Sequence, residues 1–178
     1  MTSIYSIGHG TRPIEEFIHV LRATDVKVLA DIRSAPGSRR HPQFGQAPLA
    51  ASLAQARIDY VHLRGLGGRR DAALDSRHVA LRVDAFRGYA DHMDSAEFAA
   101  DYARLDAIAS EKPTAFMCAE TLWWRCHRRL LSDRFAVDGW DVVHLLAAAK
   151  REPHRLWEVA RVVDDRLVYD GGAIPLGR

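Results

Sequence analysis

Short apolar runs alternate along the chain with longer segments in which apolar residues recur every three or four positions. The short runs lie at 4–7, 26–32, 60–63, 114–118 and 142–146. Each is mostly apolar and bounded by glycine, proline or polar residues, which is typical of a strand buried on both faces. Two further runs rich in β-branched residues, at 159–163 and 167–169, predict strands near the end of the chain.

The longer segments predict helices. After Thr11, a residue suited to cap a helix, apolar residues follow the i, i+3, i+4, i+7 pattern from Ile14 to Leu21. The same reasoning predicts helices over 47–57, 86–93, 95–110 and 122–137. Residues 71–82 show little periodicity, so we predict a long loop without regular secondary structure there.

Strands that alternate with helices indicate an α/β fold with a central, mostly parallel sheet covered on both faces. We find no internal repeat and no linker, so the prediction is a single three-layer domain over residues 1–178. The architecture is Rossmann-like, although no dinucleotide fingerprint is present.

Sheets of this kind bind ligands at the carboxyl ends of their strands. Several chemically active side chains follow the predicted strands: His9, Asp31, Arg33, Arg69, Arg70, Cys118 and Glu120. We therefore expect loops from four strands to converge on one site at this edge.

The densest group of such side chains lies at 118–128, a segment that holds both cysteines of the protein. Cys118 ends a predicted strand just before a predicted helix, a position that lowers a thiol pKa and favours a nucleophile. The alternative is a buried structural thiol. Glu120 suits a general base or a ligand for a substrate hydroxyl, and otherwise a surface acid paired with an arginine.

On a continuous helix over 122–137, Cys126 falls on the buried face and is interpreted as a core residue. His127 falls within the same face, where a histidine needs a hydrogen-bond partner. We therefore consider His127 either a catalytic residue or a core histidine bonded to a backbone carbonyl. Arg128 falls on the flank of this face and is a candidate anion ligand.

Charge is concentrated in one part of a chain whose net charge is only +2. Between residues 33 and 70 there are seven arginines and a single acid, Asp59. Glycine-containing basic loops bind phosphate or carboxylate groups, so Arg33, Arg39 and Arg69 are candidate anion ligands. Flexible, solvated surface loops are the alternative. Asp31, Phe44 and Tyr89 are candidate pocket residues, and the aromatic rings suit base stacking.

Other features exclude whole classes of protein. No run of eighteen apolar residues or secretory leader is visible, and two cysteines make no disulfide framework. A cytoplasmic protein without a membrane partner is therefore expected. The cysteine–arginine spacing does not match the phosphate loop of cysteine phosphatases. Cys118, Cys126, His127 and His9 are potential zinc ligands without a familiar spacing, so no metal or other cofactor is predicted.

A set of short motifs occurs in order along the chain. They are Ser6-Ile-Gly-His9, Asp31-Ile-Arg-Ser-x-Pro-x-Ser-Arg39, Pro42-Gln-Phe44, Tyr60-x-His-Leu-x-x-Leu-Gly-Gly-Arg69, Phe86-x-x-Tyr89, Cys118-x-Glu120 and Cys126-His-Arg128. The set resembles the family catalogued as domain of unknown function 488, over roughly residues 4–170. The resemblance implies a small α/β domain of prokaryotic type and brings no assigned activity.

The residues favour an enzyme, a hydrolase or transferase, that acts on a phosphate-bearing nucleotide or nucleic-acid component. Cys118, Glu120, His9 and His127 would be its catalytic residues, and Arg33, Arg39, Arg69 and Arg128 its anion ligands. A non-catalytic module that binds a nucleotide or nucleic acid is the first alternative. A metal-binding protein that uses Cys118, Cys126 and His127 is the second.

Overall fold

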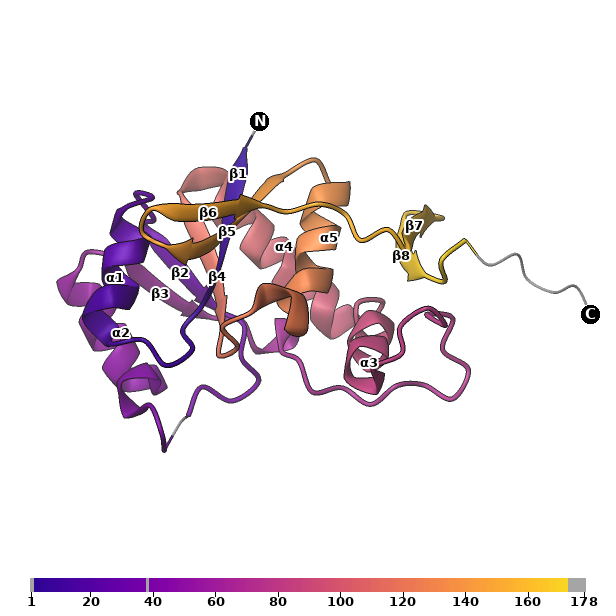
Figure 1. Ribbon diagram of the computed structural model, residues 1–178, viewed down its shortest axis with the longest axis horizontal. Coiled ribbons are helices and arrows are strands. Elements are labelled where there is room, and N and C mark those ends of the chain that lie inside the picture. The colour runs from indigo at the N-terminus through magenta and orange to yellow at the C-terminus, as the bar shows by residue number, and fades with distance from the viewer. Residues whose placement is uncertain (1, 38, 173–178) are drawn as a thin grey trace, which may run out of the picture.

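A six-stranded sheet forms the centre of the computed structural model, which describes residues 2–37 and 39–172 (Figure 1). The strands are β1 (Ser3–Gly8), β2 (Val28–Asp31), β3 (Asp59–His62), β4 (Thr114–Cys118), β5 (Asp141–Ala147) and β6 (Lys150–Pro153). Their order is β3-β2-β4-β1-β5-β6. The first five strands of this order run parallel, and only β6 is antiparallel to its neighbour.

Helices cover both faces of the sheet, as Figure 1 shows. The helices are α1 (Ile14–Arg22), α2 (Gln46–Gln55), α3 (Asp84–His92), α4 (Ala96–Glu111) and α5 (Arg128–Val137). The first two pack on one face and the other three on the opposite face, and each layer has its own buried core. The predicted three-layer α/β fold is confirmed. None of the described helices is long and apolar enough to cross a membrane.

Side chains of each strand alternate between the two cores. In β4, Phe116 and Cys118 belong to the core under α3–α5, whereas Ala115 and Met117 belong to the core under α1 and α2. Both faces are buried, which explains why the central strands read as continuous apolar runs. The alternation also decides on which face of the sheet each candidate side chain lies.

The chain after β6 forms a separate hairpin of β7 (Ala160–Val163) and β8 (Arg166–Tyr169), which lies beside α3 (Figure 1). Residues 71–82 contain no helix or strand, as predicted. They are nevertheless fixed to the body of the protein. His78 is fully buried and its Nδ1 accepts a hydrogen bond from the backbone N–H of Tyr169.

The predicted continuous helix over 122–137 is wrong. A single 3-10 turn spans Trp123–Arg125, Cys126 is extended, and α5 begins only at Arg128. The break lies at Cys126 and His127, whose side chains both turn toward Cys118 at the end of β4. In a continuous helix two adjacent side chains point about 100° apart and could not do so. As a result Trp124 is 40% exposed, while Arg128 and Ser132 are buried.

Candidate functional site

The loops that follow β1 and β4 are bound to each other at the carboxyl edge of the sheet. The backbone N–H groups of His9 and Gly10 donate to the carbonyls of Cys118 and Ala119, at 3.1 and 2.9 Å. Gly8 is required at this contact, because a Cβ there would lie 1.9 Å from the carbonyl oxygen of Glu120. The backbone around Cys118 is therefore held rigidly against β1.

Arg128 fastens the same two segments from the side of α5. It is 1% exposed and donates to Ser6 Oγ at 3.3 Å and to the carbonyl of Glu120 at 2.5 Å. A longer bond reaches the carbonyl of Thr121. The guanidinium predicted to bind a substrate anion is thus directed at backbone carbonyls.

Cys118, Cys126 and His127 form a compact cluster beside this guanidinium. The Sγ atoms of Cys118 and Cys126 lie 3.9 and 3.6 Å from His127 Nδ1. The two sulfurs and this nitrogen all lie within 4.8 Å of one another. Both cysteines are free thiols and nearly inaccessible, with exposed fractions of 8% and 3%. His127 is half-buried.

The two thiols have opposite tendencies to ionise. A hydrogen bond to Cys126, together with burial, raises the pKa of the Cys118 thiol well above its usual value. Burial acts to raise the pKa of Cys126 as well, but the bond from Cys118 and the neighbouring His127 and Arg128 lower it well below that value. These surroundings favour the thiolate form at Cys126 over that at Cys118, the predicted nucleophile.

The wall around His127 is built by the loop after β3 and by α3. Tyr89, fully buried, packs its ring 4.9 Å from the His127 ring. A Cβ on Gly68 would lie 2.7 Å from His127 Nδ1, so only glycine leaves room for the imidazole. Ser34 Oγ donates to the carbonyl of Gly68 at 2.7 Å, which ties in the loop after β2.

A second cluster lies on the opposite face of the sheet, under α1 and α2. Asp31 is fully buried and holds Arg33 through two bonds, Nε to Oδ1 at 2.9 Å and Nη2 to Oδ2 at 2.6 Å. Tyr60 donates to the same carboxylate at 2.8 Å. The positive charge of Arg33 is therefore already neutralised inside the protein.

His9 completes this second cluster. Its ring stacks on Phe44 at 4.2 Å, and its Nε2 lies 3.5 Å from Arg33 Nη1. Burial lowers the pKa of His9 to about 4. The neutral ring donates from Nδ1 to the carbonyl of Gly10, which leaves Nε2 as an acceptor for Arg33. His9 and Phe44 thus position Arg33 from within the core.

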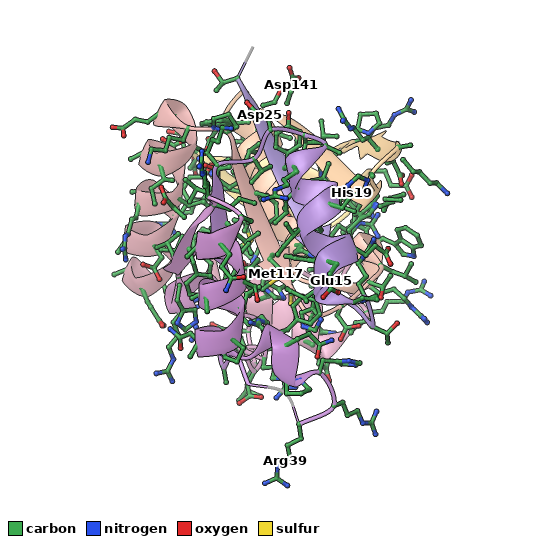
Figure 2. All side chains as sticks on the ribbon, turned by 90° about the vertical axis from the view of Figure 1, so that its left-hand side faces the viewer. Glu15, His19, Asp25, Arg39, Met117 and Asp141 are labelled. Atoms are coloured by element: carbon green, nitrogen blue, oxygen red, sulfur yellow. The ribbon has the colours of Figure 1, made fainter. Side chains whose placement is uncertain are left out.

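The structure consequently divides the predicted residues into three groups. Cys118, Cys126, His127, Arg128 and Tyr89 lie together on one face, and His9, Asp31, Arg33 and Phe44 together on the other. Glu120, Arg39 and Arg69 are exposed. In Figure 2, Arg39 lies at the bottom of the molecule, and Asp25 and Asp141 lie at the top. Asp141 begins β5, so the end that carries Arg39 is the carboxyl end of the parallel strands.

Comparison with known proteins gives one match. The model of the family described as a domain of unknown function, DUF488, matches residues 13–135, more than half of the chain. The chain belongs to the DUF488 family. No curated protein and no solved structure matches it. The DUF488 match includes the cluster around Cys118 and the Asp31–Arg33 pair, and it ends within α5.

Sequence reasoning missed a further buried network in this DUF488 protein. Asp133, His144 and His154 are joined by hydrogen bonds between α5, β5 and the segment after β6. The sequence contained a signal for it: on the predicted helix over 122–137, Asp133 follows Cys126 and Leu130 at the i, i+4, i+7 spacing of a buried face. An acid in such a stripe is buried and needs partners.

A cavity of about 280 Å³ lies between α4, α5 and β8, and none of the predicted site residues of the DUF488 protein lines it.

Proposed function

We propose that this DUF488 protein is an enzyme, a hydrolase or group transferase, that acts on a phosphate-bearing nucleotide or nucleic-acid component. The observation that carries the proposal is that two exposed charged residues, Glu120 and Arg69, are close in sequence to the walls of the Cys118–His127 cluster at the carboxyl edge of the sheet. The two residues come from separate loops: Arg69 directly follows Gly68, which lies against His127, and Glu120 lies two residues after Cys118. Ligands of parallel α/β sheets bind at this edge.

Arg69 supports the anion-binding part of the proposal. Its side chain is exposed, and its φ of +63° lies in the left-handed region that non-glycine residues rarely adopt. Arg57 has the same backbone conformation at the opposite edge of the sheet, so the position of Arg69, and not its φ, supports an anion site. Arg69 directly follows Gly68, which touches His127, so a phosphate held here would lie beside the cluster.

Glu120 is the group best suited to move a proton. It is exposed, whereas Cys118 and His9 are buried, and its own backbone is clamped by Arg128. In the proposed reaction its carboxylate accepts a proton from the attacking water or hydroxyl group. General base catalysis of this kind contributes roughly 10²–10⁴-fold to a rate. Free thiols beside this group fit a reducing, cytoplasmic environment.

The purified protein is tested against nucleoside mono-, di- and triphosphates and a single-stranded oligonucleotide, with product formation as the readout. We expect Glu120→Gln to lower kcat by about 10²-fold or more. Arg69→Ala should raise KM about tenfold, because a charge-assisted hydrogen bond is lost. Arg57→Ala is the matched control, an exposed arginine with a φ of +60° that precedes β3 at the amino edge.

Turnover that depends on Glu120 and Arg69 but not on Arg57 supports the proposal. Binding without turnover of any compound, with Glu120→Gln leaving the affinity unchanged, would instead establish a non-catalytic binding module. If neither binding nor turnover responds to Arg69→Ala, the anion site lies elsewhere.

A further inference from the structure

The side chains of Cys118, Cys126 and His127 gather two sulfurs and one imidazole nitrogen around a single point. We infer that these three residues form a binding site for a soft divalent metal ion of the Zn²⁺ type. Thiolate and imidazole are the ligands that zinc takes in proteins. The inference rests on the geometry of these groups and not on the proposed reaction.

The spacing of the atoms fits a tetrahedral ion. An ion about 2.3 Å from sulfur and about 2.0–2.1 Å from nitrogen holds sulfur and nitrogen about 3.6 Å apart. The distance from Cys126 Sγ to His127 Nδ1 is 3.6 Å, and that from Cys118 Sγ is 3.9 Å. A movement of a few tenths of an ångström by the Cys118 side chain would bring its sulfur to the same distance from the imidazole.

The break between the 3-10 turn and α5 is what makes this arrangement attainable. Neighbouring residues of an α-helix point about 100° apart around its axis, so they cannot share one ion. Here Cys126 is extended, with φ −129° and ψ 151°, and His127 is the N-terminal cap residue of α5. Their side chains consequently converge on Cys118, which ends β4.

Polar groups of the protein lie against the two sulfurs. The backbone N–H of Glu120 is hydrogen-bonded to Cys118 Sγ, and the buried Arg128 guanidinium lies close to both cysteines. Outer contacts of this kind orient and tune metal ligands. Two adjacent buried thiolates repel each other, whereas a bound divalent cation neutralises both, and each ligand that is still a thiol loses its proton to solvent when the ion binds.

The ligand count predicts the type of site. Within residues 2–37 and 39–172 no fourth histidine, cysteine or carboxylate joins the group. Three protein ligands leave one position for water or substrate, which is the pattern of catalytic zinc and not of structural zinc. The exposed Glu120, two residues after Cys118, is the nearest acid in the sequence to this position.

The experiment uses the full chain without a polyhistidine tag, purified under reducing conditions. Elemental analysis measures the metal content, and Co²⁺ is then titrated into chelator-treated protein. We expect the thiolate-to-cobalt charge-transfer and tetrahedral absorption bands, with saturation near one ion per chain. Cys118→Ser, Cys126→Ser and His127→Gln should each weaken Co²⁺ binding by at least about tenfold.

His92→Gln is the matched control, because His92 is a half-buried histidine of α3 whose ring nitrogens bond to the carbonyl of Gly65 and the hydroxyl of Ser95. Alkylation of the wild-type thiols gives a second readout that needs no variant. Bound Co²⁺ or Zn²⁺ should protect both cysteines, and a chelator should remove the protection. Absence of metal from the purified chain, together with no spectral change on titration, would overturn the inference whatever the enzyme assay shows.

Discussion

The carboxylate of Asp133 accepts a hydrogen bond from Nε2 of His154 at 2.8 Å, and both side chains are completely buried. The hydroxyl of Tyr169 and the backbone N–H of Trp157 donate to the same carboxylate, each at 3.0 Å. Through this one acid, α5 holds both the segment after β6 and strand β8. His154 in turn bonds His144 of β5 at 3.0 Å.

We expect Asp133→Ala to destabilise the protein by about 3–5 kcal/mol, because the buried donors lose their common acceptor. The free energy of unfolding is measured by urea titration. Asp59→Asn serves as the control, since the Asp59–Lys112 pair is largely exposed and such pairs contribute at most about 1 kcal/mol. An Asp133→Ala effect no larger than that of the control would contradict the role given to this network.

The stability of the protein should depend on the protonation of His9. Burial lowers the pKa of His9 to about 4 from its ordinary value of 6.5. Between pH 6.5 and pH 4 the unfolded chain therefore binds a proton at this site that the folded chain does not. The contribution is complete above pH 6.5, and stability falls as the pH falls through this range.

Replacing His9 by Gln should make the pH dependence shallower, although His78 and His144, whose pKa values are also lowered by burial, still contribute. The melting temperature is measured from pH 7 to pH 4.5. His19→Gln should keep the wild-type slope, because His19 lies on the outer surface of α1 (Figure 2). Equal slopes for His9→Gln and wild type would mean that His9 is solvated in the folded protein.

Gly68→Ala should impair the cluster around His127 directly. The added Cβ would lie 2.7 Å from Nδ1, so the ring must move away from the two sulfurs. We expect Co²⁺ affinity to fall about tenfold or more, which titration measures. In Gly37→Ala, the control, the new methyl group meets nothing within 4 Å. Wild-type affinity in Gly68→Ala would show that the imidazole is not a ligand.

The central strands β1, β2, β4 and β5 could be predicted from the sequence because they lie inside the sheet and read as apolar runs, whereas the exposed, charged edge strand β6 was not predicted. The break at Cys126 could not, since the helical wheel assumes an uninterrupted helix and the residues around the break keep apolar spacing. Alternation places Asp31 with Leu29 and Cys118 with Phe116. Alternation alone does not say whether Asp31 and Cys118 lie on the same face of the sheet. Strand order and register decide this, and both are properties of the assembled sheet.

Arg128 links the fold to the candidate site, and a charge-conserving substitution tests this link. Its guanidinium reaches Ser6 and the carbonyls of two loop residues at once, which the single ammonium of lysine does not reproduce. We expect Arg128→Lys to lower the melting temperature and to make Cys118 and Cys126 more reactive toward iodoacetamide, because the loop after β4 is released from β1. Arg125→Lys, at an exposed position of the preceding turn, should change neither property. Unaltered thiol reactivity in Arg128→Lys would show that the two cysteines are held in place without this guanidinium.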